Sequence, residues 1–272
     1  MRKTRPLALL SAGPIRADAA ARLPAIQQRL GPVWGSSFPV SCRLVNGLGA
    51  GYAARRMSEA LSCDLILVNA PRPHLASLMS RMASAGDWWG KTVLLDSDGP
   101  DSRALEPLAR RGAATGSIVP LEGIEEPWYV IEGDPAARRE ARALVKAAGA
   151  RVLELTPEAW PLWSAAQSFT DVLMVPLLSA AADAMRAAGV PSHQAGPMAE
   201  MMLRRTWRAY RKAGKQAWRA PALWTEPEAV ERQRQALDRL NPRLRRLFDS
   251  LLAQAVDVLE REERLRAASA GS

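Results

Sequence analysis

A change in hydrophobic periodicity near residue 157 is the feature that most constrains how this chain can fold. Before it, short apolar runs alternate with segments whose apolar residues recur at helical spacing. The clearest short run, Leu65 to Val68, is apolar throughout, as expected of a strand buried on both faces of a parallel sheet. After residue 157 only helical periodicity remains. We therefore predict an α/β domain over residues 1–156, with a parallel sheet covered by helices, and an all-α domain over residues 157–272.

Turn residues separate the predicted elements within each domain. Strands are predicted at residues 7–10, 32–36, 63–68, 91–95, 113–119, 128–132 and 151–155. Helices are predicted at residues 16–30, 53–61, 74–85, 102–111, 136–148, 161–188, 196–212 and 226–266. Asp134 is the predicted N-cap of the helix over 136–148. The Asn241-Pro242 step divides the last segment into two helices.

Composition excludes several classes of protein. Two cysteines and two histidines in 272 residues are too few for a disulfide scaffold or a histidine-rich metal centre. No unbroken run of 18 apolar residues occurs, so we predict no membrane span. The basic residues at 2 and 3 and the apolar run from Leu7 to Leu10 resemble a signal peptide, but the run is short. A first strand behind a basic leader is the preferred interpretation, and it predicts a cytoplasmic protein.

The turn after the first strand is the first place to look for a ligand site, because open parallel sheets bind ligands at the carboxyl ends of their strands. A dinucleotide-binding turn has the pattern Gly-x-Gly-x-x-Gly, of which this chain keeps only the middle glycine, Gly13. Pro14 removes one amide, whereas Arg16 could itself bind phosphate. One interpretation is an altered dinucleotide site, and the other is a related domain that no longer binds dinucleotide. The candidate cofactor-binding residues in this turn are Ser11, Ala12, Gly13, Pro14, Ile15 and Arg16.

The end of the second predicted strand bears on which dinucleotide would bind. An acidic residue there favours NAD, but the segment from Trp34 to Ser37 has none. Its absence favours NADP if a nucleotide binds, and Ser36 joins the candidate cofactor-binding residues. An empty pocket would have the same sequence.

Several segments together resemble a known family. They are Asp64 to Pro71, Asp96 to Gly99, Gly116 to Leu121, Tyr129 to Asp134, Trp163 to Asp171, and Val230 to Leu237. In this order they are similar to a Rossmann-like family of unknown function with a 6-phosphogluconate-dehydrogenase-like helical C-terminal domain. Pyrroline-5-carboxylate reductases and β-hydroxyacid dehydrogenases are its more distant relatives. The resemblance implies that a nicotinamide lies beside Asn69, Ala70, Pro71, Arg72 and Ser97.

The polar positions of that family are the ones that differ in this chain. Asp96, Val119 and Trp163 stand where the family has histidines. The Lys and Asn that face the substrate in the β-hydroxyacid relatives correspond to Gln167 and Asp171, four residues apart on one helical face. Glutamine cannot transfer a proton, whereas the carboxyl group of Asp171 can.

Two functional hypotheses follow from the resemblance and its departures. The first is an NADP-dependent oxidoreductase that acts on a small anionic carbonyl, imine or hydroxy acid in a cleft between the domains. The second is a non-catalytic Rossmann-like relative that binds another ligand or a protein partner.

The helical domain carries a basic segment. Its seven cations are Arg204, Arg205, Arg208, Arg211, Lys212, Lys215 and Arg219, with no acid and with Trp207, Tyr210 and Trp218 between them. A solvated helix face with its aromatic residues packed inward is the preferred interpretation. A face that closes over an anionic ligand comes second and nucleic-acid binding third. The resemblance implies a homodimer built by the helical domain, and the apolar stretch from Val172 to Met185 agrees with this.

Overall fold

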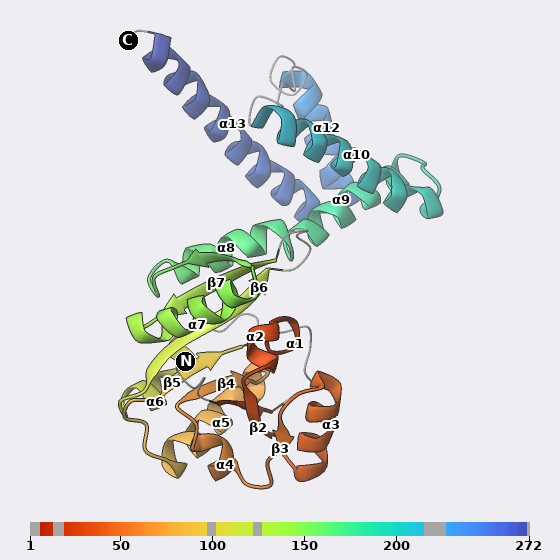
Figure 1. Ribbon diagram of the computed structural model, residues 1–272. Coiled ribbons are helices and arrows are strands. Elements are labelled where there is room, and N and C mark those ends of the chain that lie inside the picture. Colours follow the sequence, from red (N-terminus) through yellow and green to blue (C-terminus); the bar gives the residue numbers. More distant parts are fainter. Residues whose placement is uncertain (1–5, 13–18, 97–101, 122–126, 215–226, 271–272) are drawn as a thin grey trace. The chain divides into compact units, whose positions relative to one another are not determined.

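The computed structural model describes residues 6–12, 19–96, 102–121, 127–214 and 227–270, and it divides into two compact units, Met1–Ala165 and Ala166–Ser272. In the described part of the first unit, one eight-stranded sheet has the order β3-β2-β1-β4-β5-β6-β7-β8 (Figure 1). The strands are β1 Leu7–Ser11, β2 Leu30–Trp34, β3 Tyr52–Ala53, β4 Leu65–Asn69, β5 Thr92–Leu95, β6 Ala114–Leu121, β7 Trp128–Gly133 and β8 Arg151–Glu154. The sheet is mostly parallel, as predicted, but β6 and β7 pair antiparallel. Six residues separate them in sequence, which is too few for the crossover that a parallel pair needs.

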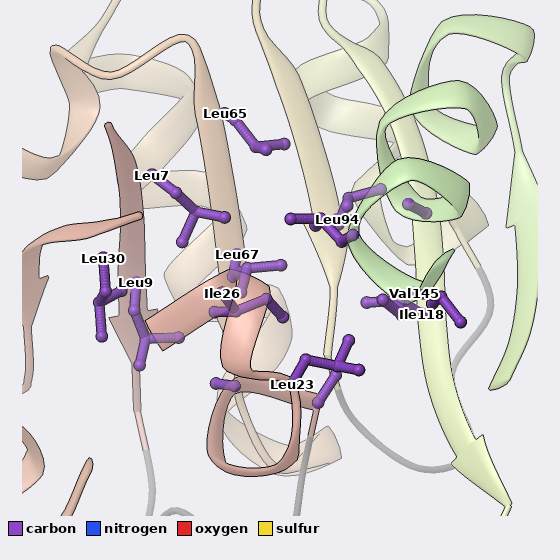
Figure 2. Close-up of a cluster of buried hydrophobic side chains, with 14 of the residues drawn as sticks. Leu7, Leu9, Leu23, Ile26, Leu30, Leu65, Leu67, Leu94, Ile118 and Val145 are labelled. Carbon is purple, nitrogen blue, oxygen red and sulfur yellow. The ribbon is translucent and has the colours of Figure 1, made fainter. Parts of the chain in front are cut away.

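Helices cover both faces of this sheet. They are α1 Ala19–Arg22, α2 Pro24–Gln27, α3 Phe38–Leu48, α4 Met57–Leu61, α5 Arg72–Ala85, the 3-10 helix η1 Ser102–Leu105, α6 Glu106–Ala109 and α7 Pro135–Ala147. One buried cluster joins the strands to α1, α2, α3 and α7, and a second joins the opposite face to α4, α5, η1 and α6. Figure 2 shows part of the first cluster, with Leu67 and Leu94 of the strands near Ile26 and Val145 of the helices.

Two predicted elements of this unit need correction. The predicted strand at 32–36 lies at Leu30–Trp34, because the amide of Gly35 donates to the hydroxyl of Ser41 (2.9 Å) and not to a neighbouring strand. Leu23 separates α1 from α2 in the predicted helix over 16–30, and Pro24 begins the second of them.

The start of α7 also differs from its prediction. Asp134 occupies the N-cap position but its side chain forms no cap hydrogen bond. Its Oδ2 accepts a hydrogen bond from the backbone amide of Thr115 (2.7 Å) and so ties α7 to β6. Gly133 has φ +118°, and a Cβ there would lie 2.3 Å from the carbonyl oxygen of Thr115. Only glycine therefore fits this junction.

The described residues of the second unit are helical throughout. α8 Trp160–Thr170 crosses the division between the units, and α9 Met174–Ala187, α10 Ser192–Ala213, α12 Pro227–Leu240 and α13 Pro242–Ala270 follow it (Figure 1). The predicted break at Asn241-Pro242 is confirmed, and Asn241 Oδ1 accepts from the amide of Arg243 (2.9 Å). Arg234 and Asp249 join α12 to α13 (2.7 Å).

One helical stretch of the described residues, Trp160–Ala187, is long and apolar enough to cross a membrane by length and composition alone, with a mean hydropathy of 1.3. A search for unbroken apolar runs does not detect this stretch, because Gln167, Asp171 and Asp183 interrupt it. The mean hydropathy belongs to the most apolar window of 18 residues in this stretch, and only 6% of that window is buried within the chain.

Candidate functional site

The strand order places a switch point between β1 and β4. From β1 the chain builds β2 and β3 on one side, and it returns to the other side of β1 to build β4, β5 and β6. Ser11 and Asn69 are register partners at the carboxyl ends of these two strands, and the amide of Ala12 donates to the carbonyl of Asn69 (2.9 Å). Ligands of open α/β sheets bind in the crevice outside such a switch point, so this edge is the candidate site.

Buried polar side chains gather at the same edge. Ser11 and Asp96 are fully buried and Asn69 is nearly so. The Nδ2 of Asn69 donates to the backbone carbonyl of Asp96 (2.8 Å), which joins the ends of β4 and β5. Buried polar groups are kept when they have hydrogen-bond partners, so these contacts fix the orientation of the Asn69 side chain.

The carboxylate of Asp96 is the most unusual feature of this edge. Its Oδ1 accepts from the amide of Ala19 (2.8 Å) and its Oδ2 from the amide of Ala20 (2.9 Å), at the start of α1. Burial raises the pKa of the nearby Tyr129 phenol, while Arg22 lowers that pKa and Asp96 raises it. A carboxylate of the protein therefore occupies two amides of the first helix after β1, where Rossmann-type proteins offer amides to a phosphate.

A second buried carboxylate lies on the neighbouring strands. Glu132 of β7 is fully buried, and it accepts from the amide (2.6 Å) and from the hydroxyl (2.8 Å) of Ser102 at the start of η1. Ser117 of β6 is its register partner, and the buried Ser117 hydroxyl makes no hydrogen bond within the part of the chain that the structure describes. Sequence reasoning missed this group, although one acid ending the apolar run of β7 was a signal that could have found it.

The predicted cofactor-binding residues fall into three groups. Ser11, Ala12 and Asn69 meet at the switch point, and the buried Ala70 follows them. Pro71, Arg72 and Ser36 are exposed, the first two where α5 begins and the third beyond the end of β2. The remaining predictions, Gly13, Pro14, Ile15, Arg16 and Ser97, lie outside the described residues.

The predicted catalytic pair belongs to the second unit. The amide of Asp171 donates to the carbonyl of Gln167 (2.9 Å), so both residues lie on one turn at the end of α8, and both are exposed. Gln167 and Asp171 are therefore neighbours on one helical turn, as predicted from their spacing. Ser11, Ala12 and Asn69 lie together in the first unit.

Two of the positions where the family has histidine meet in one apolar cluster. Val119 of β6 is buried with Val130 and Trp160, and Trp163 of α8 packs against them. The indole nitrogen of Trp163 is buried, and the described residues offer it no acceptor. Apolar packing therefore surrounds both of these positions.

Comparisons with known proteins agree with this fold. Residues 128–255 match the family described as Domain of unknown function (DUF2520). No curated protein sequence matches the chain. A protein from Thermotoga maritima has a TM-score of 0.69 at 15% identity, over 94% of this chain and 99% of its own.

Two solved complexes of an imine reductase from Myxococcus stipitatus are also similar. Its V8 variant with NAD+ has a TM-score of 0.66, and the enzyme with NADP+ a TM-score of 0.64. Each is 18% identical and covers 93% of this chain and 94% of its own. At such identities the likeness shows the fold alone, which is the Rossmann-like fold with a helical C-terminal region that the sequence resemblance predicted. Residues 128–255 therefore resemble a domain of unknown function, and the chain as a whole has the Rossmann-like fold with a helical C-terminal region that these solved structures share.

Proposed function

We propose that this protein is an NADP-dependent oxidoreductase that acts on a small anionic carbonyl, imine or hydroxy acid. The observation that carries the proposal is the β1–β4 switch point, where Ser11 and Asn69 are register partners at the carboxyl ends of two buried strands. The Myxococcus imine reductases that share the fold were solved with NAD+ and NADP+.

The residues at the end of β4 are suited to hold a dinucleotide, whereas the first amides of α1 are already bound by a carboxylate of the protein and cannot also bind its phosphates. The carbonyl of Asp96 fixes the Asn69 amide, and Pro71 leads the backbone into α5. The Asp96 carboxylate already holds the amides of Ala19 and Ala20. A diphosphate would therefore bind through residues 11–16, of which Arg16 offers the positive charge.

The residues of the chain have distinct roles in this proposal. A bound nicotinamide supplies or accepts the hydride. Asn69 orients the ring, since its side chain is held by a hydrogen bond. Asp171 holds the proton that the reacting oxygen or nitrogen gains or loses. Gln167 cannot transfer a proton, but its side-chain amide can donate a hydrogen bond to the substrate.

Titration with NADPH and NADH, followed by tryptophan fluorescence, tests the cofactor. We expect saturable binding, tighter for NADPH, and weaker NADPH binding by Arg16→Ala. Arg110→Ala is the matched control, because this exposed arginine pairs with Glu106 on α6 and precedes the amino end of β6. No saturable change with either nucleotide up to millimolar concentration excludes the proposal. Unchanged binding by Arg16→Ala removes the phosphate role of that residue.

A non-catalytic relative is the second candidate function. The apolar contact of Val119 with the cluster around Trp163, where the family has histidines, favours it. This candidate predicts no nucleotide-dependent oxidation or reduction even where a ligand binds at the switch point. Turnover of any carbonyl, imine or hydroxy acid with NADPH or NADP+ contradicts it.

We further propose that a second copy of the chain covers the apolar surface of α8 and α9. Leu162 is 77% exposed and Phe169 67%, and Val172 and Val175 are exposed beside them. Monomeric proteins rarely leave so continuous an apolar surface in water. Light scattering after size exclusion should show a dimer for the parent chain and a monomer for Phe169→Asp. Trp89→Ser removes another exposed aromatic residue, in the first unit, and should leave the dimer intact.

Two results decide against this dimer. A parent chain that is monomeric at micromolar concentration contradicts it. Flotation of the parent chain with lipid vesicles assigns the apolar surface to a membrane instead.

We propose a cytoplasmic location. The run that resembles the core of a signal peptide is β1, which is buried throughout and pairs with β2 and β4. Its removal by a signal peptidase would delete a central strand of the sheet. A fusion of residues 1–30 to a secreted reporter should remain inside the cell, and export of the reporter contradicts the proposal.

A further inference from the structure

The second half of α10 is exposed on all its sides. Every residue from Arg204 to Gly214 is exposed. Trp207 is 58% and Tyr210 50% exposed, and their rings stack with centroids 5.9 Å apart and an interplanar angle of 22°. The predicted solvated helix face is therefore confirmed, whereas the prediction that Trp207 and Tyr210 pack inward is wrong. Trp218, Lys215 and Arg219 lie outside the described residues.

The charge of this half-helix is positive throughout. Its described cations are Arg204, Arg205, Arg208, Arg211 and Lys212. Glu200 pairs with Arg204 (2.6 Å), and the sequence has no further acid until Glu226. Among the described residues, four of these cations have no ion-pair partner, and they lie within about two turns of helix.

A hollow lies along the same helix. It has a volume of about 560 Å³, and its described lining is Pro197, Glu200, Met201, Arg204, Arg205 and Arg208. Trp207, Tyr210, Arg211 and Lys212 lie beyond this lining.

The cations of this half-helix form a stripe along it. At 100° per residue, Arg204, Arg208 and Arg211 lie on one side of the helix, with Trp207 beside them. The span from Pro197 to Lys212 is roughly 22 Å at 1.5 Å per residue.

We propose that this surface binds single-stranded nucleic acid. Four cations along the helix match a phosphate backbone, and exposed aromatic faces beside them match unpaired bases, which stack on such side chains. A small anion would occupy the hollow and leave the aromatic residues and two cations unused. A helix lying on a membrane carries bulky apolar residues opposite its cations. Within residues 204–213, Thr206, Tyr210 and Ala213 stand opposite, and the one bulky residue among them, Tyr210, carries a polar hydroxyl. The proposal does not rest on dinucleotide binding at the sheet.

The test uses the full chain and a fluorescein-labelled oligothymidylate of 12 nucleotides, followed by anisotropy. With four phosphates neutralised at about 0.7 ions each, affinity should fall about 50-fold between 50 and 200 mM salt. The variant Arg205→Gln/Arg208→Gln should reduce that fall to about sevenfold. Its helical circular dichroism should equal that of the parent chain, because both residues are exposed.

Aromatic variants separate base stacking from charge alone. Trp207→Ala should weaken binding about fivefold or more. Trp89→Ala, the matched control, removes an exposed tryptophan of the first unit and should have no effect. Four results overturn the proposal. The first is no binding of the oligothymidylate at 50 mM salt, and the second is equal binding of duplex DNA together with no effect of Trp207→Ala. The third is displacement of the oligothymidylate by 1 mM NADPH, and the fourth is stronger binding of the protein to anionic vesicles than to the oligothymidylate.

Discussion

Removing the Asp96 carboxylate tests the arrangement at the switch point most directly. Asp96 is fully buried and joins β5 to the start of α1, 77 residues away in sequence, through the amides of Ala19 and Ala20. Hydrogen bonds to a charged group contribute about 1.5–3 kcal/mol each. Asp96→Ala removes two of them and should lower the free energy of unfolding by about 3–6 kcal/mol. Asp96→Asn keeps one acceptor and should lose about half as much.

Amide exchange is the appropriate assay, because a chain of two units need not unfold in one step. Peptides that contain residues 19–22 should exchange about 100-fold to 10,000-fold faster in Asp96→Ala, which corresponds to the same free energy at 1.4 kcal/mol per factor of ten. Urea unfolding should follow the same order of variants. Glu106→Ala is the control, because this exposed carboxylate makes only a surface ion pair with Arg110, which contributes less than about 1 kcal/mol.

The reasoning fails if Asp96→Ala is within 1 kcal/mol of the parent chain. It also fails if exchange at residues 19–22 is unchanged while the whole chain loses stability. Either result would mean that the carboxylate does not hold α1 against the sheet. The amides of α1 would then be free to receive a phosphate, and the restriction placed on the dinucleotide would disappear.

Three further predictions concern the sheet and its helices. Gly133→Ala should prevent folding of the first unit, seen as loss of near-ultraviolet circular dichroism, because its Cβ would lie 2.3 Å from the Thr115 carbonyl at φ +118°. Ser117→Ala should leave the urea midpoint unchanged or raised, because the buried hydroxyl makes no hydrogen bond within the described residues. The hydrogen bond from Arg142 holds the pKa of Glu154 below its ordinary value. The pair should therefore add up to about 1 kcal/mol to the free energy of unfolding at neutral pH. Urea titrations should show the parent chain more stable than Glu154→Gln by this amount, and the difference should vanish as the pH falls through the lowered pKa of Glu154.

The sequence predicted most of the fold because the signals were local. Apolar runs marked β1, β4 and β5, and Asn241-Pro242 marked the break between α12 and α13. α3 was missed, although Pro39 in its first turn and Gly49, which ends it at φ +64°, are helix-boundary signals. The apolar residues around α3 form a mixed pattern, so its boundary residues were the better signal for this helix.

The candidate site was less predictable because its contacts join residues that are far apart in sequence. Asp96 was recognised only as a residue that replaces a histidine. Its bond to Ala19 and Ala20 depends on β5 lying two strands from β1, and no local pattern encodes that. Glu132 and Ser102 are likewise 30 residues apart. In both cases a carboxylate binds the start of a helix that lies far away in sequence, so the spacing of residues along the chain could not predict the contact.

The three positions at which the sequence resemblance implies histidines lie in two different structural settings. At Asp96 a new carboxylate binds backbone amides, which stabilises the start of α1 and takes up donors that an anion could otherwise use. At Val119 and Trp163 two apolar side chains belong to one cluster between β6 and α8. A single histidine placed in that cluster would bury a polar ring among apolar side chains, which costs stability. We therefore expect that the histidines implied by the resemblance could be introduced at Val119 and Trp163 only as a pair, with a smaller loss of stability than either substitution alone.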